Sequence, residues 1–77
     1  MPTTQATDPA DQFSARMGQL IGAASDNNDA AELTTLNHQA LGAYYATGDD
    51  RFRQLANYAA ECAMRVRSAA RAAATRH

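Results

Sequence analysis

Apolar residues recur every three or four positions in three segments of this chain, and turn-forming residues separate the segments. This spacing is typical of amphipathic helices, whereas no segment alternates apolar and polar residues as a half-buried strand does. The β-branched residues are mostly isolated threonines. Because short connections favour antiparallel neighbours, the sequence predicts an all-α fold: a three-helix bundle, or a helical hairpin with a docked N-terminal helix.

The first predicted helix covers residues 9–24. Asp8 can cap this helix, and Pro9 fits its first position. Its apolar face consists of Phe13, Met17, Leu20, Ile21 and Ala24. Residues 1–7 show no such periodicity, so we expect a disordered N-terminal lead followed by a single helical domain over residues 8–77.

Two further helices are predicted over residues 30–47 and 50–74. Asp29 can cap the earlier of the two, with Glu32 placed for a capping box, and Gly48 can end it in a left-handed conformation. The residue before the later helix is also an aspartate and can cap it. This third helix is the longest, near 37 Å at about 1.5 Å per residue. We therefore expect its C-terminal end to extend beyond the other helices by about two turns.

A chain of 77 residues has a small core, and such domains often depend on a disulfide, a metal or oligomerisation. Cys62 is the only cysteine, and with His38 and His77 it does not supply the spaced ligands of a structural zinc site. We therefore expect no metal and no cofactor, and we expect support from self-association or a protein partner. The absence of signal-peptide features and of a run of about 18 apolar residues predicts a cytoplasmic protein without membrane contact.

Charge is divided unevenly along the chain. Residues 1–50 carry seven acids and one arginine, a net charge of −6, whereas residues 51–77 carry six arginines and one glutamate, a net charge of +5. Acids at helix N-termini and bases at a C-terminus explain part of this division. It also favours docking of the basic end on an acidic partner, or on the acidic half of a second copy. The residues predicted to make protein contacts are Tyr44, Tyr45, Phe52, Arg65, Arg67, Arg71 and Arg76.

Residues 38–58 resemble a single tetratricopeptide repeat, whose signature includes W-x2-L-G-x2-Y. The matching residues are Leu41, Gly42, Tyr45 and Tyr58. Histidine, glutamine and valine stand where the family has tryptophan, alanine and a closing proline. The resemblance implies a helical hairpin that binds peptides or proteins, with Gly42 allowing the following helix to pack closely.

A nucleic-acid interface is the alternative interpretation of the third helix. A glycine-containing turn at residues 47–49 precedes side chains of the types that read bases, which are Arg51, Arg53, Gln54 and Asn57. Two aspartates at the start of that helix and an overall pI near 6.0 stand against this interpretation.

No catalytic residue is predicted, because Cys62 on an alanine-rich helical face is typical of an inert small hydrophobic residue. Asn37 falls within the apolar face of the second helix and needs a hydrogen-bond partner there. The sequence as a whole predicts a non-enzymatic protein-interaction module. We expect it to be an accessory or regulatory subunit that acts through an unidentified protein partner or as a homodimer.

Overall fold

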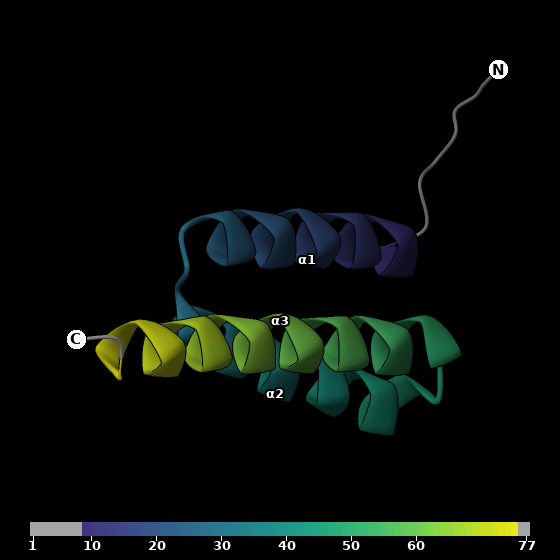
Figure 1. Ribbon diagram of the computed structural model, residues 1–77. Coiled ribbons are helices and arrows are strands. Elements are labelled where there is room, and N and C mark those ends of the chain that lie inside the picture. Colours follow the sequence, from purple (N-terminus) through teal and green to yellow (C-terminus); the bar gives the residue numbers. More distant parts are fainter. Residues whose placement is uncertain (1–8, 76–77) are drawn as a thin grey trace, which may run out of the picture.

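The computed structural model describes residues 9–75, which form three α-helices and no strand. The helices α1 (Pro9–Asp26), α2 (Ala30–Thr47) and α3 (Asp50–Ala74) run up, down and up, so α2 is antiparallel to both others (Figure 1). The all-α prediction is confirmed, and the closest pairing is between α2 and α3. The predicted lead-in and the cap at Asp8 lie outside the described residues. None of the described helices is both long and apolar enough to span a membrane.

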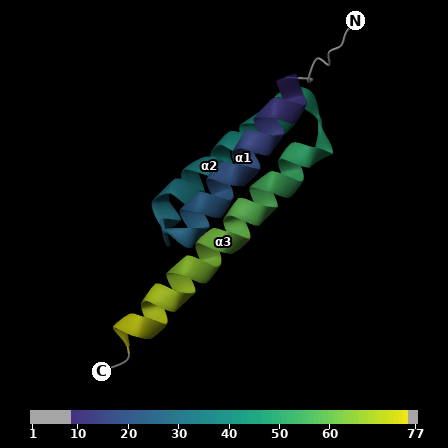
Figure 2. The same cartoon turned by 90° about the horizontal axis from the view of Figure 1, so that it is seen from above.

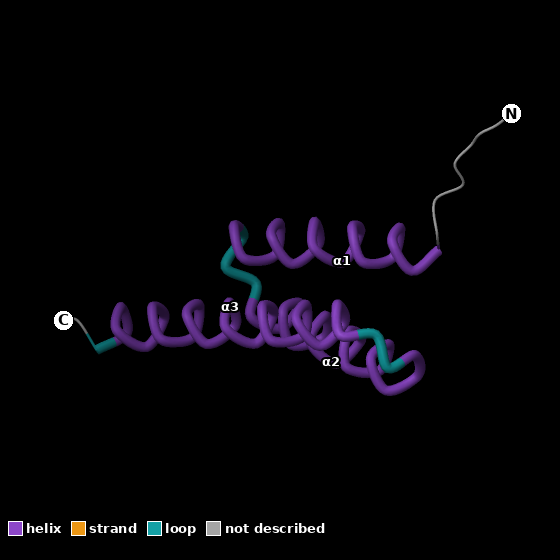
Figure 3. The backbone as a smooth tube through the Cα atoms, turned by 90° about the vertical axis from the view of Figure 1, so that its right-hand side faces the viewer, coloured by secondary structure: helices purple, strands orange, loops and turns teal. Residues whose placement is uncertain are grey.

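Helix α1 continues two residues beyond its predicted end, to Asp26, because the polar residues that follow close a Schellman motif. The N–H of Asn28 donates to the carbonyl of Ser25 at 3.0 Å, and the N–H of Asp29 donates to the carbonyl of Ala24 at 2.9 Å. Asn28 adopts a left-handed φ of 56°, which asparagine tolerates better than most residues. A short connection of three residues, 27–29, therefore leads directly into α2 (Figure 3).

Two aspartates cap the later helices, as the sequence predicts. The Asp29 carboxylate accepts from the N–H of Glu32 at 3.0 Å, and the Asp49 carboxylate accepts from the N–H of Arg51 at 3.0 Å. The second half of the predicted capping box is not formed among the described residues, because the N–H of Asp29 already donates to α1. Each short connection thus ends one helix and caps the next.

Two glycines, Gly42 within α2 and Gly48 at its C-cap, differ in whether their backbone conformation needs a glycine. Gly48 ends α2 with a left-handed φ of 71°, and its N–H donates to the carbonyl of Tyr44 at 2.6 Å. Gly42 lies within α2 and is exposed, and a Cβ added there would meet nothing within 4 Å. The close helix approach at Gly42 that the tetratricopeptide resemblance implies is therefore wrong.

Alanine substitutions at these two glycines are expected to change stability in opposite directions. Gly48→Ala should lower the free energy of unfolding by about 1 kcal/mol, because a side chain is strained in the left-handed region. Gly42→Ala should raise it by about 0.5–1 kcal/mol, because alanine loses less backbone entropy in a helix. Urea unfolding of the two variants measures both effects, and changes of the same sign would contradict the backbone described here.

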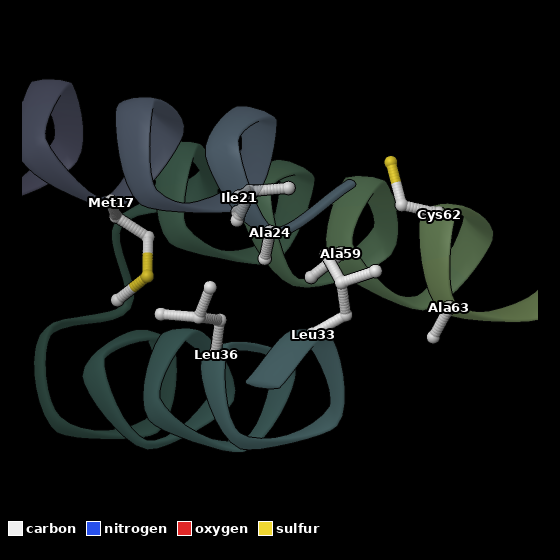
Figure 4. Close-up of a cluster of buried hydrophobic side chains, with 8 residues drawn as sticks. All are labelled: Met17, Ile21, Ala24, Leu33, Leu36, Ala59, Cys62 and Ala63. Atoms are coloured by element: carbon white, nitrogen blue, oxygen red, sulfur yellow. The ribbon is translucent and has the colours of Figure 1, made fainter. Parts of the chain in front are cut away.

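The hydrophobic core lies where the three helices meet (Figure 4). Its buried residues are Met17, Ile21 and Ala24 from α1, Leu33, Leu36 and Ala40 from α2, and Phe52, Ala56, Ala59, Cys62 and Ala63 from α3. Helix α3 thus contributes mainly small side chains, which allow it to lie close to α2. The side-chain amide of Asn37 donates to the carbonyl of Ala56 at 2.8 Å, so the polar residue within the apolar face of α2 has its partner on α3.

Phe13 and Leu20, which the sequence places on the apolar face of α1, are 40% and 43% exposed. Only a narrow row of α1, Met17, Ile21 and Ala24, faces the other helices, so Phe13 and Leu20 lie at its edge. The Phe13 ring still packs edge-to-face against Phe52, with the ring centroids 5.4 Å apart.

Candidate functional site

The C-terminal part of α3 extends beyond α1 and α2 (Figure 2). Every residue from 67 through 75 is exposed. We call residues 67–75 the projecting end. At about 1.5 Å per residue the segment is about 13 Å long, close to the overhang of about two turns that the sequence predicts.

The apolar row of α3 continues onto the projecting end without a change in spacing. Its members, three or four residues apart, are Phe52, Ala56, Ala59, Ala63, Val66, Ala70 and Ala73. The first four are buried under α1 and α2, Val66 is half-buried, and the last two are exposed. A shallow hollow of about 280 Å³ lies at the base of the projecting end, lined by Asn28, Val66, Ala69 and Ala70. The face that forms the core elsewhere on α3 is therefore uncovered here.

Arginines border this uncovered face. The guanidinium of Arg67 donates to the Thr34 hydroxyl at 2.7 Å, and that of Arg65 lies 3.2 Å from the Cys62 sulfur. Arg71 is exposed on the projecting end. None of these three arginines forms an ion pair with a residue in the range 9–75. Arg76, the fourth predicted contact arginine, lies outside the described residues.

Three acidic residues lie in and beside the connection between α1 and α2. Asp26, Asp29 and Glu32, which we call the acidic turn, are exposed where α1 passes into α2. Asn28 of the same turn lines the hollow, so the acidic turn lies at the base of the projecting end. These three acids also lack an ion-pair partner within the described part of the chain. Acids and arginines without an ion pair among residues 9–75 thus lie at the same end of the molecule, although Asp29 also caps α2.

The predicted aromatic contacts lie at the other end of the bundle. Tyr44 and Tyr45 are in the last turn of α2, with ring centroids 5.5 Å apart, and Tyr45 is 77% exposed. Phe52 is only 2% exposed, because the first turns of α3 face α1 and the ring packs on Phe13. In this structure Phe52 is a core residue and not an exposed contact. The predicted contact residues therefore form two separate groups, and the structure does not bring the tyrosines and the arginines together.

The side chains of the alternative nucleic-acid surface are largely engaged with acids. Arg51 forms ion pairs with Asp11 and with Asp49, the latter with nitrogen and oxygen 2.6 Å apart. Arg53 pairs with Asp50 at 2.8 Å, and the Gln54 amide donates to the same carboxylate at 3.3 Å. Asn57 is exposed. Hydrogen bonds that the Arg51 guanidinium donates to Asp49 and Asp11 raise its pKa, so it stays charged, but its charge is matched locally.

These ion pairs predict a loss of stability in acid. Side-chain and backbone hydrogen bonds from Arg51 lower the pKa of Asp49, and a hydrogen bond from Arg53 lowers that of Asp50. A lowered pKa stabilises the fold above the unfolded-state pKa of about 4, and the contribution disappears as the pH falls through the folded-state pKa.

The melting temperature should therefore fall between about pH 5 and pH 2. The Asp49→Asn variant, which keeps a capping acceptor without the charge, should show a shallower fall over the same range. Circular dichroism melts at each pH measure both curves. Parallel curves for the two proteins would contradict a role for the Asp49 charge.

In the described part of the chain, the remaining residues of types that catalyse reactions or bind metals lie apart from one another. Cys62 is 1% exposed, whereas His38 is exposed on α2. Among residues 9–75, no three His, Cys, Asp or Glu side chains gather as a metal site requires. The sequence interpretation missed two exposed apolar side chains of α3, Tyr58 at 43% and Met64 at 66%. Their angular offset from the apolar row of α3 is the signal that could have identified them.

Comparisons with known proteins identify no relative. No family model matches the chain, and no match was found among curated proteins or among solved structures.

Proposed function

We propose that this chain is a non-enzymatic protein-interaction module, an accessory or regulatory subunit that contacts its partner through the projecting end of α3. One observation carries the proposal: the apolar row that forms the core continues onto a segment whose every residue is exposed. A helix face of this kind is a recurrent mode of peptide and protein recognition, in which residues at spacings of three and four act as contacts.

The bordering arginines support this use of the segment. Arginine stems cover apolar surface while their guanidinium groups stay hydrated, and arginine is enriched at protein interfaces. Because Arg65, Arg67 and Arg71 form no ion pair with residues 9–75, their charges are available to an acidic partner. The buried Cys62 is the only cysteine, which suits a reducing compartment, and we place the module in the cytoplasm.

A matched pair of variants tests the proposal. Ala70→Glu puts a charge on the uncovered face, and Ala72→Glu puts the same charge about 200° around the helix. Both positions are exposed, so both variants should fold. When tagged chains recover proteins from the native host, wild type and Ala72→Glu should retain one partner in stoichiometric amount, and Ala70→Glu should lose it. Equal recovery by the two variants, or the absence of both a host partner and self-association of the purified chain, would contradict the proposal.

Nucleic-acid binding is the alternative function, and a separate experiment tests it. Titration of duplex DNA at low salt should give no binding, because the arginines at the start of α3 are paired with aspartates. Salt-sensitive binding that is lost when Arg51 and Arg53 are replaced by glutamine would favour the alternative and count against the protein-interaction role.

A further inference from the structure

We infer that the projecting end binds a second copy of this chain, and that two projecting ends pair in an antiparallel arrangement. This inference rests on the proposed function, since it assigns a partner to the same face. It is carried by three observations: charges of both signs without an ion pair among residues 9–75 at one end of the molecule, a hollow beside them, and an uncovered helix face.

Charged side chains form ion pairs at one end of the bundle, whereas those discussed at the other end have no ion-pair partner among residues 9–75. At the start of α3 the arginines are neutralised within the chain, by Asp11, Asp49 and Asp50. At the other end, neither the three acids of the acidic turn nor the three arginines Arg65, Arg67 and Arg71 have an ion-pair partner among residues 9–75. Glu61 of α3 is a further exposed acid beside Arg65. Within residues 9–75 the acidic turn and the three arginines form no ion pair with each other. A second copy supplies a complementary surface for each set.

Antiparallel pairing brings these surfaces together. If a two-fold axis passes near Ala70, Val66 of one copy is level with Ala74 of the second copy. The end of each α3 then lies in the hollow of the other copy, against Asn28, Val66 and Ala69. Arg71 of one copy approaches the acidic turn of the other. A parallel arrangement would instead place like charges side by side.

The expected dimer is weak. Two helical ends of about 13 Å bury less than the roughly 1,200 Å² of a standard specific interface. We therefore expect a dissociation constant of about 10–100 μM. Exposed ion pairs are screened strongly at about 1 M salt, where the Debye length is near 3 Å, so salt should weaken the dimer.

Sedimentation velocity on the full chain tests the inference. Between about 1 μM and 1 mM the average mass should rise from 8.2 kDa toward twice that value. Ala70→Glu should remain monomeric over the whole range, because two carboxylates would meet at the axis. Ala72→Glu, with the same charge change, should associate like the wild type. A monomer at every concentration, or equal loss in both variants, would overturn the inference.

Exchanging the charges of Arg71 and Asp26 tests the antiparallel arrangement. Arg71→Asp and Asp26→Arg should each weaken the dimer by about 5–10-fold, since each removes two symmetry-related pairs. The double variant should recover most of the wild-type affinity. Additive weakening in the double variant would contradict contact between Arg71 and the acidic turn of the second copy.

A failure of the dimer inference can be distinguished from a failure of the proposed function. If the purified chain stays monomeric while Ala70→Glu, but not Ala72→Glu, loses a different host protein, the second copy is the wrong partner and the surface is correct. If capture of the host protein is equal in both variants, the surface itself is wrong.

Discussion

Replacing Leu36 by alanine is expected to remove roughly half of the stability of this protein. The Leu36 side chain is 1% exposed, and only a few large side chains, such as Ile21 and Leu33, are buried as completely. Deleting a fully buried leucine costs about 2–5 kcal/mol, the upper values where the cavity cannot collapse. A domain of this length has a total stability of about 4–11 kcal/mol. Because most core residues that α3 contributes are alanines, only the side chains of Met17, Ile21 and Leu33 could move to fill part of the space.

Leu20→Ala is the matched control, because it makes the same chemical change at a side chain that is 43% exposed. Its cost should be about 1 kcal/mol or less. Urea unfolding followed by circular dichroism gives both values. Equal destabilisation by the two substitutions would mean that Leu20 is buried or that Leu36 is not, and it would contradict the placement of α1 on the hairpin.

The second large effect is expected from Ala59→Leu. Ala59 is 0% exposed in the core where α2 and α3 pack most closely. A leucine there must separate these helices, which also lengthens the bond from the Asn37 amide to the Ala56 carbonyl. Overpacking of this kind costs about 1–3 kcal/mol, and loss of the hydrogen bond adds about 1 kcal/mol. At about 4–8 °C per kcal/mol, the melting temperature should fall by about 10–25 °C.

Ala72→Leu serves as the control for this substitution. Ala72 is exposed on α3, and surface changes of this kind usually alter stability by less than about 0.5 kcal/mol. A melting temperature for Ala59→Leu within a few degrees of that for Ala72→Leu would contradict close packing of α2 against α3.

The helices could be predicted because their determinants are local. The caps at Asp29 and Asp49 and the left-handed Gly48 act within a few residues of the helix ends, so the bounds of α2 and α3 agree with prediction. The end of α1 differs by two residues, because the polar residues after Ala24 can continue a helix or stop it. The Schellman bonds of Asn28 and Asp29 decide between these possibilities.

Tertiary placement could not be predicted in the same way. The exposure of Phe13 and Leu20 depends on how α1 lies across the hairpin, and periodicity alone does not determine this. The pairing of Arg51 with Asp11 joins residues forty positions apart. The projecting end follows from the unequal helix lengths, but the hollow at its base requires the α1–α2 turn to meet α3 at Val66. Phe52 fits the apolar spacing of α3, but the prediction that it is also an exposed contact is wrong, because its degree of burial depends on the same tertiary placement.

The antiparallel pairing of projecting ends is tested most directly by paramagnetic relaxation between copies. A spin label is attached to Thr75→Cys in a Cys62→Ala background, and this chain is mixed with isotope-labelled chain that carries no spin label. Antiparallel pairing predicts that amide signals of the acidic turn, Asp26 and Asp29 above all, broaden in the isotope-labelled copy. Ala70→Glu in the isotope-labelled copy should abolish this broadening. Broadening confined to residues 70–75, or none near 1 mM total protein, about tenfold above the weakest expected dissociation constant, would contradict the pairing.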